Sequence, residues 1–177
     1  MFQVISPIIG NQKCFPFYLS GIGISDPEYH IIREGGLIAH QILFTLEGEG
    51  IIKINNQSYV NKKGSIFYVA SGVPHEYYPV DGNWTTCWVV FRGDSLDELM
   101  TRLGFPKYIC KMAQEIENIR KKFSMIFSAA KLPIHGEEKC SLLIYDYIMT
   151  VRKVLLLNMD LSSGSIIHNA MVYINEN

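Results

Sequence analysis

Four side chains in the middle of the sequence have the chemistry to hold one small polar molecule. Arg33 offers a fixed fork of hydrogen-bond donors, and Trp88 offers an aromatic face on which a ring can stack. Tyr77 and Thr86 add hydroxyl groups. Each also has a more ordinary interpretation, because Arg33 could pair with an acidic neighbour at the surface and Trp88 could belong to the core. We predict a ligand-binding site that contains these four residues together with His75.

His75 also ends a stretch that is similar to one half of the metal site of cupin barrels. The stretch starts at Gly64 and reaches His75 after a Gly-Val-Pro turn, with Ala70 where proline is usual. The other half is missing, because Gln41 stands where a glutamate ligand would be and no His-x-His precedes it. A single histidine does not supply the three or four ligands that such a metal needs. We therefore expect no metal and no other cofactor.

Motifs for other kinds of catalysis are also missing from the sequence. No Gly-x-Ser-x-Gly leads from a strand into a helix, and the pair Gly21 and Gly23 is too short for a phosphate-binding loop. We expect a protein that is not an enzyme and that binds a ligand in a cavity. Two alternatives remain open, which are a small metal-dependent cupin enzyme and a barrel that binds nothing and serves as a dimerisation module.

The stretch from Arg33 to Phe91 must position these side chains, and its pattern is that of a β-barrel. Short apolar strands alternate there with turns rich in Gly, Asn and Pro, as expected for an antiparallel barrel or sandwich. The pair Asn55-Asn56 tolerates positive φ angles and predicts a two-residue hairpin.

After this stretch the period changes from two to 3.6, which predicts helices. Ser95–Leu103 is expected to be a short helix with Ser95 as its N-cap, and Lys111–Ala130 an amphipathic one. Glu137–Leu157 carries two apolar stripes, so it must bury both sides. One side would face its own domain, and the other a second helix or a second chain.

Composition limits the class of protein further. The 177 residues are 48% hydrophobic and carry a net charge of −1, so this piece alone has no concentrated positive field for nucleic acid. The four cysteines are far apart and no apolar run approaches the length of a membrane span. We expect a cytoplasmic protein with reduced thiols and no contact with a membrane.

Five ordered segments together resemble the N-terminal sensor and dimerisation domain of AraC-family transcription regulators. They are Arg33 with Gly36, Leu46-Glu47-Gly48-Glu49-Gly50, Lys63-Gly64-Ser65-Ile66, Ser71-Gly72-Val73-Pro74-His75-Glu76-Tyr77 and Trp84-Thr85-Thr86-Cys87-Trp88-Val89-Val90-Phe91. The resemblance implies a mainly β fold: a cupin-like antiparallel barrel (a double-stranded β-helix or jelly roll) followed by an antiparallel helix pair.

The resemblance also implies roles for individual residues. In the arabinose-responsive members a sugar lies in the barrel, and the residues that bind it fall on Arg33, Tyr77 and Trp88. A histidine of that site is replaced here by Thr86, which weakens arabinose as the ligand and leaves another sugar or small polar effector open.

The resemblance divides the chain into four parts. They are an N-terminal arm (1–25), the ligand-binding barrel (26–94), a helical region that forms a homodimer (95–158), and a linker with the start of a truncated DNA-binding domain (159–177). DNA would then be bound only by helix-turn-helix units that follow this chain.

Overall fold

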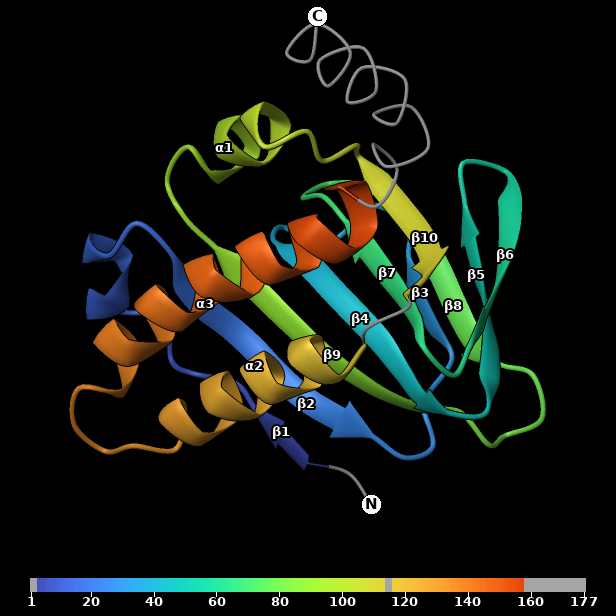
Figure 1. Cartoon of the computed structure of the whole chain (residues 1–177), viewed down its shortest axis with the longest axis horizontal. Helices are drawn as coiled ribbons and strands as arrows, with labels where there is room; N and C mark the ends of the chain where they lie inside the picture. Colours follow the sequence, from blue (N-terminus) through green and yellow to red (C-terminus); the bar gives the residue numbers. More distant parts are fainter. Residues whose placement is uncertain (1–2, 114–115, 158–177) are drawn as a thin grey trace, which may run out of the picture.

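The computed structural model describes residues 3–113 and 116–157, and these form two antiparallel sheets covered on one side by helices (Figure 1). The larger sheet has the strand order β1-β2-β9-β4-β7-β10 and the smaller sheet the order β3-β8-β5-β6. The strands of the larger sheet are Gln3–Ile5 (β1), Tyr18–Ser25 (β2), Thr85–Arg92 (β9), His40–Glu47 (β4), Ser65–Val69 (β7) and Tyr108–Met112 (β10). Those of the smaller sheet are Ile31–Arg33 (β3), His75–Pro79 (β8), Glu49–Ile54 (β5) and Gln57–Lys62 (β6).

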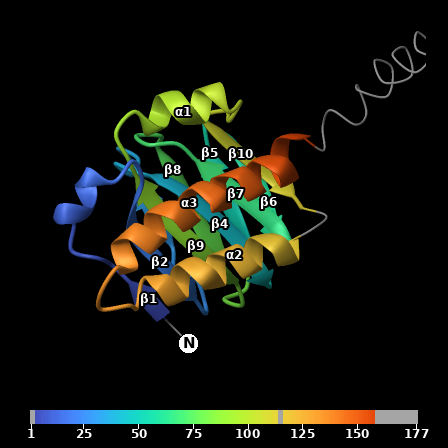
Figure 2. The same ribbon diagram turned by 60° about the vertical axis from the view of Figure 1, so that its left-hand side comes forward.

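The helices lie on the outer face of the larger sheet. The two long ones are Ile116–Ala129 (α2) and Gly136–Arg152 (α3), which runs on into a π-helical turn at Lys153–Leu157. They lie side by side across the sheet, as both views show (Figures 1 and 2). A short helix, Leu96–Arg102 (α1), and a 3-10 turn, Asn11–Cys14, complete the described elements. None of the described helices is long and apolar enough to cross a membrane.

Strand alternation divides the apolar residues into two cores. On β9, Cys87, Val89 and Phe91 face the helices and join the larger core. The smaller core lies between the two sheets and contains Leu43 of β4 and Trp84, which directly precedes β9. The predicted fold class, a jelly-roll barrel followed by helices, is confirmed.

Two turn predictions can be compared with the backbone. Asn55 and Asn56 both have positive φ angles, 50° and 59°, so the two-residue hairpin between β5 and β6 is confirmed. Ser95 directly precedes α1, but it has a φ of 56° and its side chain makes no capping hydrogen bond. The predicted N-cap position is therefore right and the predicted capping interaction is wrong.

The larger sheet extends further in the sequence than we predicted. Tyr18–Ser25 was assigned to an N-terminal arm with one or two strands lying on the barrel, and it forms β2, which pairs with β9 with one register shift between Leu19 and Gly21. Lys111 and Met112 were assigned to a helix, but they end β10, which pairs with β7 at the edge of the sheet. At Lys111 and Met112, pairing with a distant strand overrides the local helical pattern. The predicted linker and DNA-binding segment, 159–177, lies outside the described residues.

Candidate functional site

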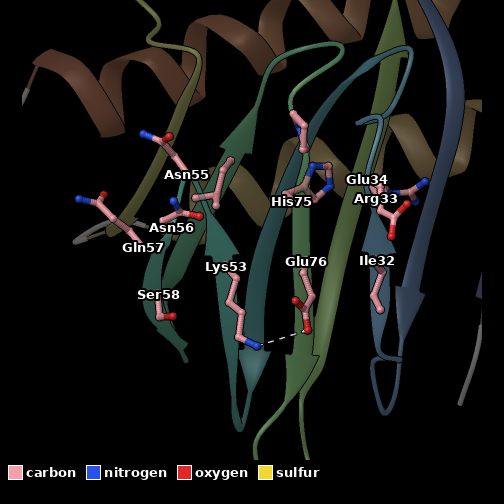
Figure 3. Close-up of a pocket in the computed structure, with 12 residues that line it drawn as sticks. Ile32, Arg33, Glu34, Lys53, Asn55, Asn56, Gln57, Ser58, His75 and Glu76 are labelled. Carbon is pink, nitrogen blue, oxygen red and sulfur yellow. Dashed lines mark hydrogen bonds and ion pairs between the residues drawn. The ribbon is translucent and has the colours of Figure 1, made fainter.

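A cleft of about 460 Å³ lies at one end of the smaller sheet, beside the hairpin tip between β5 and β6 (Figure 3). Strands β3, β5 and β8 and the hairpin supply its walls. Its lining residues are Ile32, Arg33, Glu34, Lys53, Ile54, Asn55, Asn56, Gln57, Ser58, Pro74, His75 and Glu76. Ile32, Lys53, Ser58 and Glu76 line the cleft from the outer face of the smaller sheet. Arg33 and His75 are paired on the inner face, so the cleft lies beside one end of the barrel interior, which we call the mouth of the barrel.

Arg33 and His75 stand opposite each other on paired strands. They are Cα partners in the β3–β8 ladder. His75 is 5% exposed, and its Nδ1 lies 2.8 Å from the carbonyl oxygen of Val73. That nitrogen must therefore carry the hydrogen, which leaves Nε2 as an acceptor. Burial, and secondarily the charge of Arg33, lowers the pKa of His75 and favours this neutral form.

Gln41 and Tyr77 lie deeper in the barrel. The Gln41 side-chain amide donates to the Tyr77 hydroxyl over 3.4 Å, and both residues are buried. Burial is the main cause that raises the pKa of Tyr77, with the charge of Glu28 second, while Arg33 acts in the opposite direction. Tyr77 thus lies near one basic and one acidic side chain inside the barrel.

The acidic side chain is Glu28, which is 4% exposed in the segment between β2 and β3. The Thr86 hydroxyl donates to its Oε2 over 2.5 Å, and the backbone N–H of Tyr29 donates to its Oε1 over 2.9 Å. A buried carboxylate needs such donors, because an isolated charge is expensive to remove from water. The Thr86 hydroxyl is therefore already bonded within the protein.

Trp88 lies against the glycines of β2. Its indole Nε1 donates to the Ser25 hydroxyl over 3.0 Å. A Cβ at Gly23 would lie 2.6 Å from the indole ring, and one at Gly21 would lie 3.2 Å from it. Glycine at these two positions makes room for the half-buried ring, so β2 fixes where Trp88 stands.

Four buried side-chain polar atoms in the described part of the chain have no hydrogen-bond partner. Three belong to the barrel: Arg33 Nε, Gln41 Oε1 and His75 Nε2. The fourth, the hydroxyl of Tyr147, is on α3. Buried polar groups are nearly always paired, so the three unpaired atoms in the barrel are available to water or to a polar ligand.

The five predicted site residues all lie on the inner face of the barrel. The structure pairs Arg33 with His75 beside the cleft and stacks His75 on the deeper Tyr77. Thr86 and Trp88 are on β9 and are bonded to other side chains. Their role in ligand binding stays a prediction.

Two polar residues of this region were not predicted as site residues. Gln41 had a signal, because it occupies the position of a glutamate ligand in the cupin motif. Glu28 had none, since a charged residue after Asp26-Pro27 resembles an ordinary exposed loop.

The histidines of the barrel do not form a metal site. His40 faces the helix side, where its Nδ1 and Nε2 contact the Tyr68 hydroxyl and Asp97 at 3.0 and 3.3 Å. His75 faces the interior and stacks on Tyr77. Within the described residues, no group of three or more His, Cys, Asp or Glu side chains is arranged to hold a metal ion.

The family described as the AraC-like ligand binding domain matches residues 17–148, well over half of the chain. The chain belongs to this family. Two solved structures of AraC-like regulators share the fold of the domain. Apo ToxT K231A from Vibrio cholerae strain SCE256 has a TM-score of 0.52 and 11% identity over 78% of this chain and 56% of its own. The AraC-like transcriptional activator CuxR has a TM-score of 0.52 and 10% identity over 86% of this chain and 60% of its own.

The AraC-like domain therefore spans 56% and 60% of the length of these two regulators. At 10–11% identity they show the fold and leave the ligand undetermined. No curated protein sequence matches the chain.

Proposed function

We propose that this AraC-like domain senses a small, sugar-like polar effector, which it binds at the mouth of the barrel. The observation that carries this proposal is the set of three unpaired buried atoms on Arg33, Gln41 and His75, next to an open cleft. An effector that reaches these atoms would make hydrogen bonds that no other group of the described chain supplies. Trp88 would supply the stacking face and Tyr77 a further hydroxyl.

The proposed effector would control DNA binding by segments that follow this chain. It would do so by changing the arm or the dimer, since a ligand shifts an equilibrium only through a difference in affinity between two states. We propose the cytoplasm as its compartment, in keeping with four free cysteines among the described residues.

We also propose that the helices form a homodimer. The support is the outer side of α3, where the side chains of Leu142 and Tyr145 are 76% and 44% exposed. Tyr147, an apolar residue of the same helix, is fully buried and joins the larger core, so it is available only to its own domain. An interface on α3 would therefore use Leu142 and Tyr145 and not Tyr147.

Calorimetric titration with candidate sugars tests the effector proposal. For a sugar that binds, we expect Arg33→Ala and Trp88→Ala each to weaken affinity about tenfold or more. Arg102→Ala is the matched control, because Arg102 is an exposed arginine on α1 that pairs with Glu98. Unchanged affinity in both barrel variants would show that the pocket is somewhere else. Failure of any sugar to bind would favour a dimerisation module that takes no ligand.

A further inference from the structure

Two of the three unpaired buried atoms in the barrel are hydrogen-bond acceptors. Among the three unpaired buried atoms, Gln41 Oε1 accepts, and His75 Nε2 accepts because the other ring nitrogen donates to Val73. Arg33 Nε–H is the one donor of the three. A molecule that satisfies all three must donate at least two hydrogen bonds and accept one.

Glu28 increases this excess of acceptors. Each of its carboxylate oxygens receives one hydrogen bond, from Thr86 and from the Tyr29 amide. A carboxylate oxygen can accept two, so Glu28 retains capacity for further donors. It offers no donor of its own in the ionised form.

The charges inside the barrel balance. Arg33 and Glu28 are side chains of opposite charge type, and both influence the pKa of Tyr77, in opposite directions. His75 is held neutral by burial and by the arginine opposite. An anionic ligand that approached Arg33 would therefore also face the buried carboxylate of Glu28 and the lone pair of His75.

We propose that the effector site selects a neutral, donor-rich molecule of the polyol or amide type and rejects carboxylates and phosphates, although it contains an arginine. The effector donates to Gln41 and His75 and accepts from Arg33. This inference rests on the proposed function, because it assumes that the mouth of the barrel is where the effector binds. It narrows that function by excluding the acidic ligands that a buried arginine would otherwise favour.

Matched neutral and acidic sugars test the proposal on the whole chain. D-glucose and D-galactose are titrated beside D-glucuronate and D-galacturonate, and myo-inositol beside its monophosphate, each to about 100 mM by calorimetry. We expect at least one neutral member to bind and its acidic counterpart to bind at least tenfold more weakly. His75→Phe removes the acceptor and should weaken the neutral ligand about tenfold, whereas His30→Phe, at an exposed histidine outside the barrel, should not.

Glu28→Gln gives a second, independent readout. Removing the negative charge should raise the affinity of the acidic member relative to the neutral one, because Arg33 is then no longer balanced. If the acidic members bound the wild type as tightly as the neutral ones, and Arg33→Ala abolished that binding, this inference would be overturned. The barrel would then remain the effector site. Binding by neither set would overturn the proposed function together with it.

Discussion

Replacing Thr86 by valine should destabilise the domain by about 2 kcal/mol. Thr86 is fully buried and its hydroxyl donates to the Glu28 carboxylate over 2.5 Å. Hydrogen bonds to charged groups contribute roughly 1.5–3 kcal/mol, and valine has nearly the same shape as threonine, so no cavity adds to the cost. With a urea m-value of about 2 kcal/mol/M, the unfolding midpoint should fall by about 1 M.

The matched control is Thr85→Val, on the same strand. Thr85 faces the opposite side and its hydroxyl donates to the Asp26 carboxylate in an exposed pair. Exposed pairs of this kind contribute little, so we expect a change of about 0.5 kcal/mol or less. The comparison separates the loss of a buried hydrogen bond from the general effect of threonine to valine on a strand.

A double-mutant cycle with Glu28→Gln measures the pair itself. Glutamine keeps an acceptor for Thr86 and removes the charge, so Thr86→Val should cost only about 1 kcal/mol in that background. The expected coupling is then about 1 kcal/mol. Equal costs for the two threonine variants, or additive effects of Thr86 and Glu28 within about 0.3 kcal/mol, would refute the role assigned to this hydrogen bond.

Three further predictions concern packing, pH and assembly. Gly50→Ala should lower the free energy of unfolding in urea by about 2 kcal/mol or more, because its Cβ would lie 2.3 Å from the Trp84 ring. Gly35→Ala is the control and should be nearly neutral, because nothing lies within 4 Å of its Cβ. Similar costs for the two variants would contradict the packing described. Because the pKa of His75 is lowered from 6.5 in the folded state, the unfolded chain takes up the proton first as pH falls. Stability from this residue is thus complete above pH ~6.5 and is lost as pH falls below it. His75→Gln should therefore flatten the stability profile below pH ~6.5, and an unchanged slope would argue against a neutral His75. Leu142→Glu should give monomers in sedimentation at an unchanged melting temperature, and a variant that associates like the wild type would place the dimer interface away from this side of α3.

Strand β9 shows how far the sequence reaches toward the site. Its order, Thr86-Cys87-Trp88-Val89, alternates two faces, and Thr86 and Trp88 were proposed for the site from their side-chain chemistry and from the family resemblance. The sequence pattern does not show that the Thr86 hydroxyl and the Trp88 indole are already hydrogen-bonded within the protein. The partners of Thr86 and Trp88 are 58 and 63 positions away in the chain.

Strand β2 shows the opposite case. Tyr18–Ser25 has no clear period because most of its residues are buried whichever face they occupy, and Gly21 and Gly23 resemble a flexible segment. Their actual role is to leave space for Trp88. A glycine that serves packing cannot be told from a glycine that serves flexibility until the distant side chain is in place.

The sequence by itself determined the turns, the succession of short strands, the amphipathic helices and the family resemblance. The turns, strands and helices depend on residues that are a few positions apart, and the resemblance depends on the order of short segments along the chain, so neither requires the tertiary structure. The tertiary structure alone decided that Glu28 is buried, that Tyr18–Ser25 is a strand of the larger sheet, and that Arg33, Gln41 and His75 keep unpaired polar atoms. Those properties depend on hydrogen bonds and contacts between strands far apart in the chain, which form only when the barrel closes.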